Sequence, residues 1–166
     1  MVNTRRKKGF TLVEAMIALA VAGILISVGA RLIIQANRYF VLSNARVGLQ
    51  EEARSVMYVV TRNLRQAQNA TITIGRYSAS QPYYSQITFT TGQGATMTFF
   101  QNGNLLEMQS GTMTKVLCTD LVYLAFTFPR SDDMSIVSVS MTLQNGTYQG
   151  KVKALHMASE KVQVMN

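Results

Sequence analysis

The sequence has one cysteine, one histidine, two prolines and no tryptophan among 166 residues. The single cysteine, Cys118, excludes a disulfide within the chain, so an exported domain would be held together by core packing alone. Its apolar context, Val116-Leu117-Cys118, indicates a buried small hydrophobe. The single histidine, His156, lies in an alternating strand pattern and is interpreted as a surface or structural residue rather than a catalytic base.

Signals of catalysis and of cofactor or metal binding are also missing. The sequence has no glycine-rich phosphate loop, no nucleophile elbow and no cluster of residues with metal-ligand spacing. Asp132 and Asp133 are adjacent, but a calcium loop needs several oxygen ligands, and a turn after Pro129-Arg130-Ser131 explains the pair more simply. We therefore predict no enzyme, no cofactor and no bound metal.

Acidic residues are few, with 8 Asp and Glu against 16 Lys and Arg and a formal net charge of +8. From Thr71 onward six cations stand against five acids, and six minus five leaves +1. This balance does not favour phosphate binding, so no specific nucleic-acid partner is expected. Four of the positive charges form one run near the N-terminus, namely Arg5, Arg6, Lys7 and Lys8.

An apolar segment follows this basic run directly. Residues 10–30 contain one charge, Glu14. A helix of this length is about 30 Å long, enough to cross the hydrocarbon core of a bilayer, and the preceding cations predict a cytoplasmic N-terminus. An ionised carboxylate inside such a helix costs about 2.5–3.5 kcal/mol or more. Glu14 should therefore have a partner, although no neighbouring side chain is basic.

Three export signals compete for this segment. An ordinary secretory signal peptide could be cut after Val28-Gly29-Ala30, but its apolar run would exceed the usual 7–15 residues and would contain Glu14. An uncleaved signal anchor is the second reading. A twin-arginine signal at Arg5-Arg6 is the third, and Lys7-Lys8 fits that pattern poorly.

The stretch Lys8-Gly9-Phe10-Thr11-Leu12-Val13-Glu14 resembles the leader of type IV prepilins and type II secretion pseudopilins. The resemblance implies that a prepilin peptidase cuts between Gly9 and Phe10 and N-methylates Phe10. It also implies an assembly role for Glu14, the fifth residue of the mature chain. Expected partners are other pilins or pseudopilins, the prepilin peptidase, and the platform and ATPase of the assembly machinery.

A helical pattern continues beyond the apolar segment to Asn69. Its arginines drift around the helix, and the aligned pairs are Arg31 with Arg38 and Arg54 with Arg65. They are interpreted either as solvated charges or as groups that face acidic patches on neighbouring subunits or lipid head groups. Apolar residues recur at spacings of three and four, which predicts one buried face: Leu49, Ala53, Val56, Val60, Leu64 and Ala67.

Two segments of this helix carry a narrower resemblance. Gln50-Glu51-Glu52-Ala53-Arg54 and Thr61-Arg62-Asn63-Leu64-Arg65-Gln66-Ala67 are similar to the helix of minor pilins of the PilW type and, more loosely, to the J-type minor pseudopilins. Asn63 stands where that pattern often has Asp.

Alternating apolar and polar residues follow Asn69 and predict an antiparallel sheet packed on the second half of the helix. Asn102-Gly103 and Asn145-Gly146 are hairpin signals, and residues 158–166 are expected to form a loose tail. The loop with Tyr77, Tyr83 and Tyr84 is either a contact surface or packs on its own domain. Val122, Leu124, Phe126 and Phe128 are expected on one face. The expected strands are 71–74, 87–90, 97–100, 105–108, 116–118, 122–128, 136–143 and 148–157.

These observations predict an α+β, pilin-like fold with a long N-terminal helix and a C-terminal antiparallel head. The expected parts are a leader removed at residues 1–9, a transmembrane or fibre-core helix at 10–30, its amphipathic continuation at 31–69 and a β-rich head at 70–166. We expect a minor pilin or pseudopilin that helps to initiate or cap a type IV pilus or a type II secretion pseudopilus. The alternative is a signal-anchored periplasmic receptor or ligand-binding domain. The expected location is the bacterial inner membrane, with a cytoplasmic N-terminus and a periplasmic head, and then a pilus, at the cell surface, or a pseudopilus.

Overall fold

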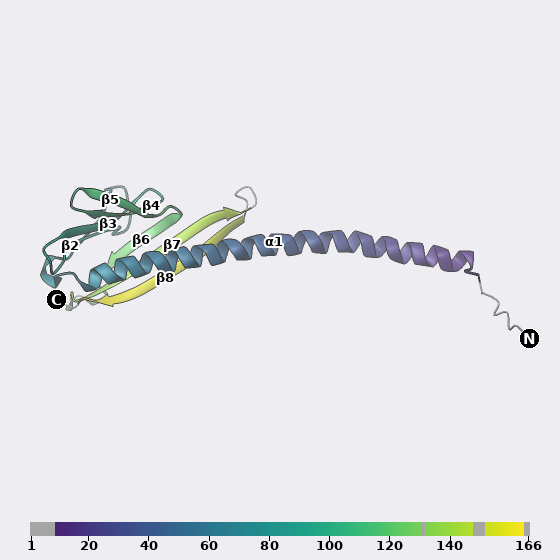
Figure 1. The fold of residues 1–166 in the computed structure, drawn as a ribbon, viewed down its shortest axis with the longest axis horizontal. Coiled ribbons are helices and arrows are strands. Elements are labelled where there is room, and N and C mark those ends of the chain that lie inside the picture. Colours follow the sequence, from purple (N-terminus) through teal and green to yellow (C-terminus); the bar gives the residue numbers. More distant parts are fainter. Residues whose placement is uncertain (1–8, 131, 148–151, 165–166) are drawn as a thin grey trace, which may run out of the picture. The chain divides into compact units, whose positions relative to one another are not determined.

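The computed structural model describes residues 9–130, 132–147 and 152–164. A long helix, α1 (Leu12–Arg65), is followed by a short 3-10 helix, η1 (Asn69–Thr71), and then by antiparallel strands (Figure 1). This confirms the predicted α+β architecture. The chain divides into two compact units, Met1–Val41 and Leu42–Asn166, and α1 contributes to both of them.

In the first unit, the helix exposes its apolar surface. None of the residues from Gly9 to Val41 is buried. By length and composition the helix could cross a membrane, and none of its most apolar window is buried within the protein. Apolar surface of this extent needs lipid or other protein to cover it. Side chains more than half exposed include Leu12, Val13, Met16, Ile17, Leu19, Ile24, Leu25 and Ile26.

The second unit contains two antiparallel sheets where the sequence analysis expected one. The first is a five-stranded meander, in the order β1-β2-β3-β4-β5, and the second has the order β6-β7-β8. The strands of the first sheet are β1 (Thr73–Gly75), β2 (Gln86–Thr90), β3 (Thr96–Asn102), β4 (Leu105–Ser110) and β5 (Met113–Cys118). Those of the second are β6 (Leu121–Thr127), β7 (Ile136–Thr147) and β8 (Val152–Gln163).

The second half of α1 packs into the core of this unit, together with residues of both sheets. Every residue of the predicted apolar face, from Leu49 to Ala67, is buried, and Val60 is only 1% exposed. Spacings of three and four bring these side chains onto one side of the helix, so the prediction is confirmed. The sheets contribute Ile87, Phe89, Phe99, Leu106, Leu124, Phe126, Val139 and Met141.

The helix ends earlier than the sequence pattern predicted. α1 stops at Arg65, and the next N–H groups, of Gln66 and Ala67, donate to carbonyls only three residues back. The N–H of Gln68 then donates to the carbonyl of Thr90 at 2.8 Å. The backbone N–H of Gln68 is thus satisfied by the end of β2 and not by another helical turn, so α1 does not continue. The first strand also begins later than expected, since Thr71 belongs to η1.

The two hairpin signals had different outcomes. Strands β3 and β4 form a hairpin as predicted, but Asn102 pairs with Leu105, so the turn residues are Gly103 and Asn104. Gly103 has a φ of +60°, which glycine adopts without steric cost. The second prediction was wrong, because Asn145 and Gly146 lie within β7 and pair with β8. Residues 148–151, and with them the predicted strand start at Tyr148, lie outside the described residues.

The predicted loose tail is also wrong over the described residues. Strand β8 continues to Gln163, which pairs with Ile136, and Val162 and Val164 are buried. The N–H of Val164 donates to the carbonyl of Ser135 at 2.8 Å. Cross-strand pairing and the burial of alternate valines therefore order a segment that has weak strand signals of its own.

A register shift corrects the predicted facing of β6. Val122 was expected to share a face with Leu124 and Phe126, but it is 45% exposed, whereas Leu121, Leu124 and Phe126 are buried. The pairing with β7 shifts between Leu121 and Tyr123. An extra residue in one strand re-aims the side chains on either side of it, and periodicity alone does not show where such a bulge falls.

Candidate processing and assembly site

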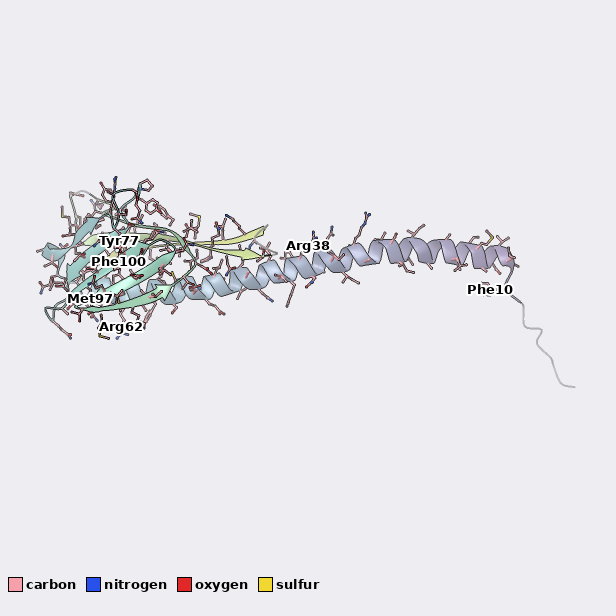
Figure 2. All side chains as sticks on the ribbon, turned by 90° about the horizontal axis from the view of Figure 1, so that it is seen from above. Phe10, Arg38, Arg62, Tyr77, Met97 and Phe100 are labelled. Carbon is pink, nitrogen blue, oxygen red and sulfur yellow. The ribbon has the colours of Figure 1, made fainter. Side chains whose placement is uncertain are left out.

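The predicted cleavage site lies immediately before α1. Gly9 and Phe10 are not helical, and Phe10 is 82% exposed (Figure 2). No heavy atom approaches within 4 Å of the position that a Cβ at Gly9 would occupy. The Gly9–Phe10 bond is thus in an exposed, non-helical segment, with open space around the Cα of Gly9. The leader cations Arg5, Arg6, Lys7 and Lys8 lie outside the described residues.

Glu14 is joined to Thr11 by three hydrogen bonds. Its Oε2 accepts from the backbone N–H of Thr11 at 2.9 Å and from the Thr11 hydroxyl at 3.1 Å. The N–H of Glu14 donates back to the Thr11 Oγ1 at 3.3 Å. This reciprocal pattern is a capping box, in which a Thr at the N-cap and an acid three residues later satisfy N–H groups that the first helical turn leaves unpaired.

The capping box gives Glu14 a hydrogen-bond partner within its own chain, Thr11. Glu14 lies in the first turn of α1, where the positive end of the helix dipole favours a carboxylate. The signal was present in the sequence, because Thr-x-x-Glu before an apolar run is the usual form of a capping box. Thr11 is therefore the residue that the sequence reasoning missed at this site.

Cys118 is a poor candidate for chemistry. It is 3% exposed, and its burial, followed by the nearby Glu52 carboxylate, raises the pKa of the thiol to about 11. Thiolates act as nucleophiles and metal ligands, and this thiol stays protonated near neutral pH. The prediction of a buried small side chain at this position is confirmed.

The adjacent aspartates bond locally. Arg130 Nε lies 3.5 Å from Asp132 Oδ1, between two exposed side chains. Asp133 accepts from the hydroxyl and the backbone N–H of Ser135, and these hydrogen bonds lower the pKa of its carboxyl. No group of three potential metal-ligating side chains occurs within the described ranges. The local hydrogen bonds fit the predicted turn.

The tyrosine loop packs on its own domain. Tyr77 stacks on Phe100 with ring centroids 4.5 Å apart. Both residues are labelled in the same region of Figure 2. Tyr83 meets Tyr123 edge to face at 4.7 Å. The guanidinium of Arg76 lies 5.5 Å above the ring of Tyr84. These contacts favour the second of the two interpretations of the loop.

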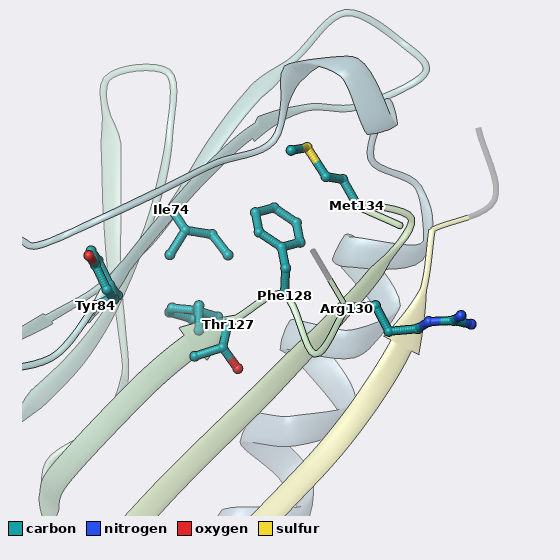
Figure 3. Close-up of a pocket in the computed structure, with 7 residues that line it drawn as sticks. Ile74, Tyr84, Thr127, Phe128, Arg130 and Met134 are labelled. Atoms are coloured by element: carbon teal, nitrogen blue, oxygen red, sulfur yellow. The ribbon is translucent and has the colours of Figure 1, made fainter. Parts of the chain in front are cut away.

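An apolar cleft of about 520 Å³ opens beside this loop, where β1 and the end of β6 meet the β6–β7 connection. Phe128 and Ile74 point into it, and Met134 stands over it (Figure 3). The charged group in its lining is Arg130, which is paired with Asp132. The cleft therefore offers little polar chemistry beyond the hydroxyls of Tyr84 and Thr127.

Comparisons with known proteins found one family model, which matches the N-terminal part of the chain, and one similar curated protein. The prokaryotic N-terminal methylation motif matches residues 4–30. The pilin-like protein PilA3 of Thermus thermophilus is 39% identical over 61 residues, which make up 37% of this chain and 26% of that protein. The matched stretch thus spans about a quarter of the length of this curated relative. No solved structure shows a significant match.

Three findings together support the type IV pilin and pseudopilin family: the methylation motif, the similar pilin-like protein, and a long helix followed by antiparallel sheets. The chain carries the N-terminal methylation motif and is similar to a pilin-like protein over 37% of its length. The motif and the exposed apolar helix support a membrane-anchored pilin.

Proposed function

We propose that this protein is a minor pilin or pseudopilin that helps to initiate or cap a type IV pilus or a type II secretion pseudopilus. The observation that carries the proposal is the N-terminal site: an exposed Gly9–Phe10 bond, a carboxylate in the first helical turn and a long apolar helix surface without cover. Bundling of such helices in a fibre core would cover this surface. The PilW-like pattern over residues 50–67 supports the minor subclass.

In this proposal the chain is made as an inner-membrane precursor with a cytoplasmic leader, residues 1–9. Prepilin peptidase removes the leader and methylates Phe10. Residues 10–30 then form the membrane or fibre-core helix, residues 31–69 its amphipathic continuation and residues 70–166 the periplasmic head. Platform and ATPase proteins of the assembly machinery draw the subunit from the membrane into the fibre.

Glu14 is proposed to set the register between subunits. Cleavage creates an amine at Phe10, which is a cation for a carboxylate in low dielectric. Within one chain, Phe10 lies just before the helix and its N-cap Thr11, so the geometry of facing i and i+4 helix positions does not apply directly. The amine of a neighbouring subunit is therefore the better partner. A pair between subunits would offset the cost of burying both charges only when the stagger is correct.

One observation favours the second candidate, a membrane-anchored ligand-binding domain. The apolar cleft lined by Phe128, Ile74 and Met134 has the size of a small-molecule site. Its open lining has few convergent polar groups that could select a ligand, so we rank this candidate second.

Co-purification tests the two candidates against each other. Cells that carry the full chain with an affinity tag should yield processed protein together with other pilin or pseudopilin subunits after detergent extraction and in sheared fibre fractions. Deletion of the gene should reduce fibre number if the subunit initiates or caps fibres. Recovery of the tagged chain without pilin-like subunits, together with unchanged fibres in the deletion strain, would contradict the proposal and favour the ligand-binding candidate.

A further inference from the structure

A second cleft, of about 700 Å³, lies in the second unit between α1 and strand β8. Three arginines from α1 line it, and Glu160 of β8 contributes the acidic group of the lining. We call it the arginine cleft. Its lining is Arg54, Tyr58, Thr61, Arg62, Arg65, Gln66 and Glu160.

The helical residues of the arginine cleft form one continuous stripe. Arg54, Tyr58 and Arg65 are separated by four and then seven positions, and spacings of three, four and seven bring side chains to one side of a helix. Arg62 is four residues after Tyr58 and is labelled at the edge of this unit in Figure 2. Over eleven residues the stripe extends about 16 Å along the helix axis. The sequence analysis predicted that Arg54 and Arg65 lie on the same side of the helix. The structure shows that Arg62, Tyr58 and strand β8 line the same cleft.

Among the described residues that line the cleft, three arginines stand against one acid, Glu160. Within the described residues, none of the three arginines forms an ion pair, whereas exposed Arg130 and Asp132 do. All three guanidinium side chains belong to exposed residues. The helix dipole accounts for cations in the last turn, Arg62 and Arg65, but not for Arg54, three turns from the end of α1.

The mixed lining indicates what the cleft would bind. Guanidinium groups match carboxylates in a two-pronged geometry, and Tyr58 and Gln66 add neutral hydrogen-bonding groups. Glu160 would repel a continuous polyanion but can accept from the N–H or hydroxyl groups of a peptide. A lipid headgroup layer is only about 5–8 Å thick. If the helix axis crosses the membrane, the headgroups can therefore contact only part of the stripe, which is about 16 Å long.

From these features we infer that the arginine cleft binds a short segment with two or more carboxylates on a neighbouring pilin-like subunit. The inference rests on the proposed function, which supplies such neighbours. The contact would join the head of one subunit to another, at residues distinct from Glu14 and Phe10. It would give the head its own electrostatic selectivity for partners, because an opposing cation in the wrong neighbour would be repelled.

A photo-crosslinker tests this inference in the full chain. Tyr58 is 63% exposed and lies in the middle of the stripe, so it is replaced by p-benzoylphenylalanine in cells that make the fibre. We expect a cross-link to a second pilin-like subunit, at a peptide that mass spectrometry shows to contain aspartate or glutamate. The same probe at Met113, which is 79% exposed on β5, is the position control and should not give this product.

Charge reversal shows whether the arginines cause the contact. Arg54→Glu with Arg62→Glu should reduce the Tyr58 cross-link at least about tenfold, because attraction is replaced by repulsion. Arg46→Glu, an exposed change on the same helix outside the cleft, is the matched control and should leave the yield unchanged. Replacing the partner's acids by arginine should restore the cross-link to the reversed variant.

Other outcomes overturn the inference. These are a product with lipid or nucleic acid, a product at a peptide without acids, no product from chain recovered in fibres, or a yield that charge reversal leaves unchanged. The proposed function is tested separately, by measuring Gly9–Phe10 processing and co-purification of the unsubstituted chain with pilin subunits. The inference can therefore fail while the proposed function stands.

Discussion

Thr11 and Glu14 bond reciprocally at the start of α1, with the carboxylate oxygen 2.9 Å from the Thr11 nitrogen and the Thr11 hydroxyl oxygen 3.3 Å from the Glu14 nitrogen. The carboxylate is therefore engaged locally while Gly9 still precedes Phe10. Two roles can be separated by mutation. One is to cap the helix, which both residues share, and the other is to pair with an amine of another subunit, which Glu14 alone can do.

Substitution at Glu14 should separate assembly from processing. Glu14→Ala should leave Gly9–Phe10 cleavage and membrane levels normal but abolish co-purification with fibre subunits, because the buried amine of a neighbour would lose its counter-charge. Thr11→Ala is the matched control: it removes the cap, at a cost of about 1 kcal/mol, but keeps the carboxylate. It should still assemble. Equal loss in both variants would indicate a capping role, and undiminished co-purification of Glu14→Ala would exclude the register role.

Processing should leave a defined N-terminus. Because the Gly9–Phe10 bond is exposed and lies outside the helix, intact mass of protein from membranes should show a chain that begins at methylated Phe10. Deletion of the prepilin peptidase gene should return the unprocessed mass. A mature chain that begins at Arg31 would establish an ordinary signal peptide and would remove the fibre proposal.

The packed face of α1 should control the stability of the second unit. A soluble form that begins near Arg38 should fold, and Val60→Asp should lower its free energy of unfolding by more than about 3 kcal/mol, because Val60 is 1% exposed and the new charge would have no partner. Ser55→Asp, on the exposed side of the same helix, should change it by less than about 0.5 kcal/mol. If Val60→Asp and the parent have the same thermal unfolding midpoint, this face of α1 is not the core contact.

The thiol of Cys118 should be protected while the domain is folded. A pKa raised from 9.0 to about 11 lowers the thiolate fraction about 100-fold at neutral pH, so alkylation by iodoacetamide should be slow until urea unfolds the protein. The folded state favours the protonated thiol, so its contribution to stability is full below about pH 9 and is lost as pH rises toward 11. Cys118→Ala should flatten this alkaline loss. Equal alkylation rates in native and urea-treated protein would contradict the burial.

The sequence alone indicated the features of the N-terminal segment, namely the basic run, the Gly9–Phe10 junction, Glu14 and the apolar segment. It also predicted the buried helix face from Leu49 to Leu64. These features are local, since charge, hydropathy and a spacing of three and four need no knowledge of distant residues. Even the capping box was available, because Thr11 and Glu14 are three residues apart. The resemblance to type IV pilins rests on this local N-terminal pattern.

The tertiary structure, and not the local sequence, determined which of the weakly predicted strands pair and in which register. Asn145-Gly146 has the local chemistry of a turn but lies in β7, because partners across the sheet extend to Thr147. Pairing with β7 likewise orders β8 to Gln163, and the shifted register of β6 turns Val122 outward. The arginine cleft also depends on an approach of α1 to β8 that joins residues about a hundred positions apart. Such long-range pairings are set by the summed burial and hydrogen bonding of both partners, and neither segment carries that information alone.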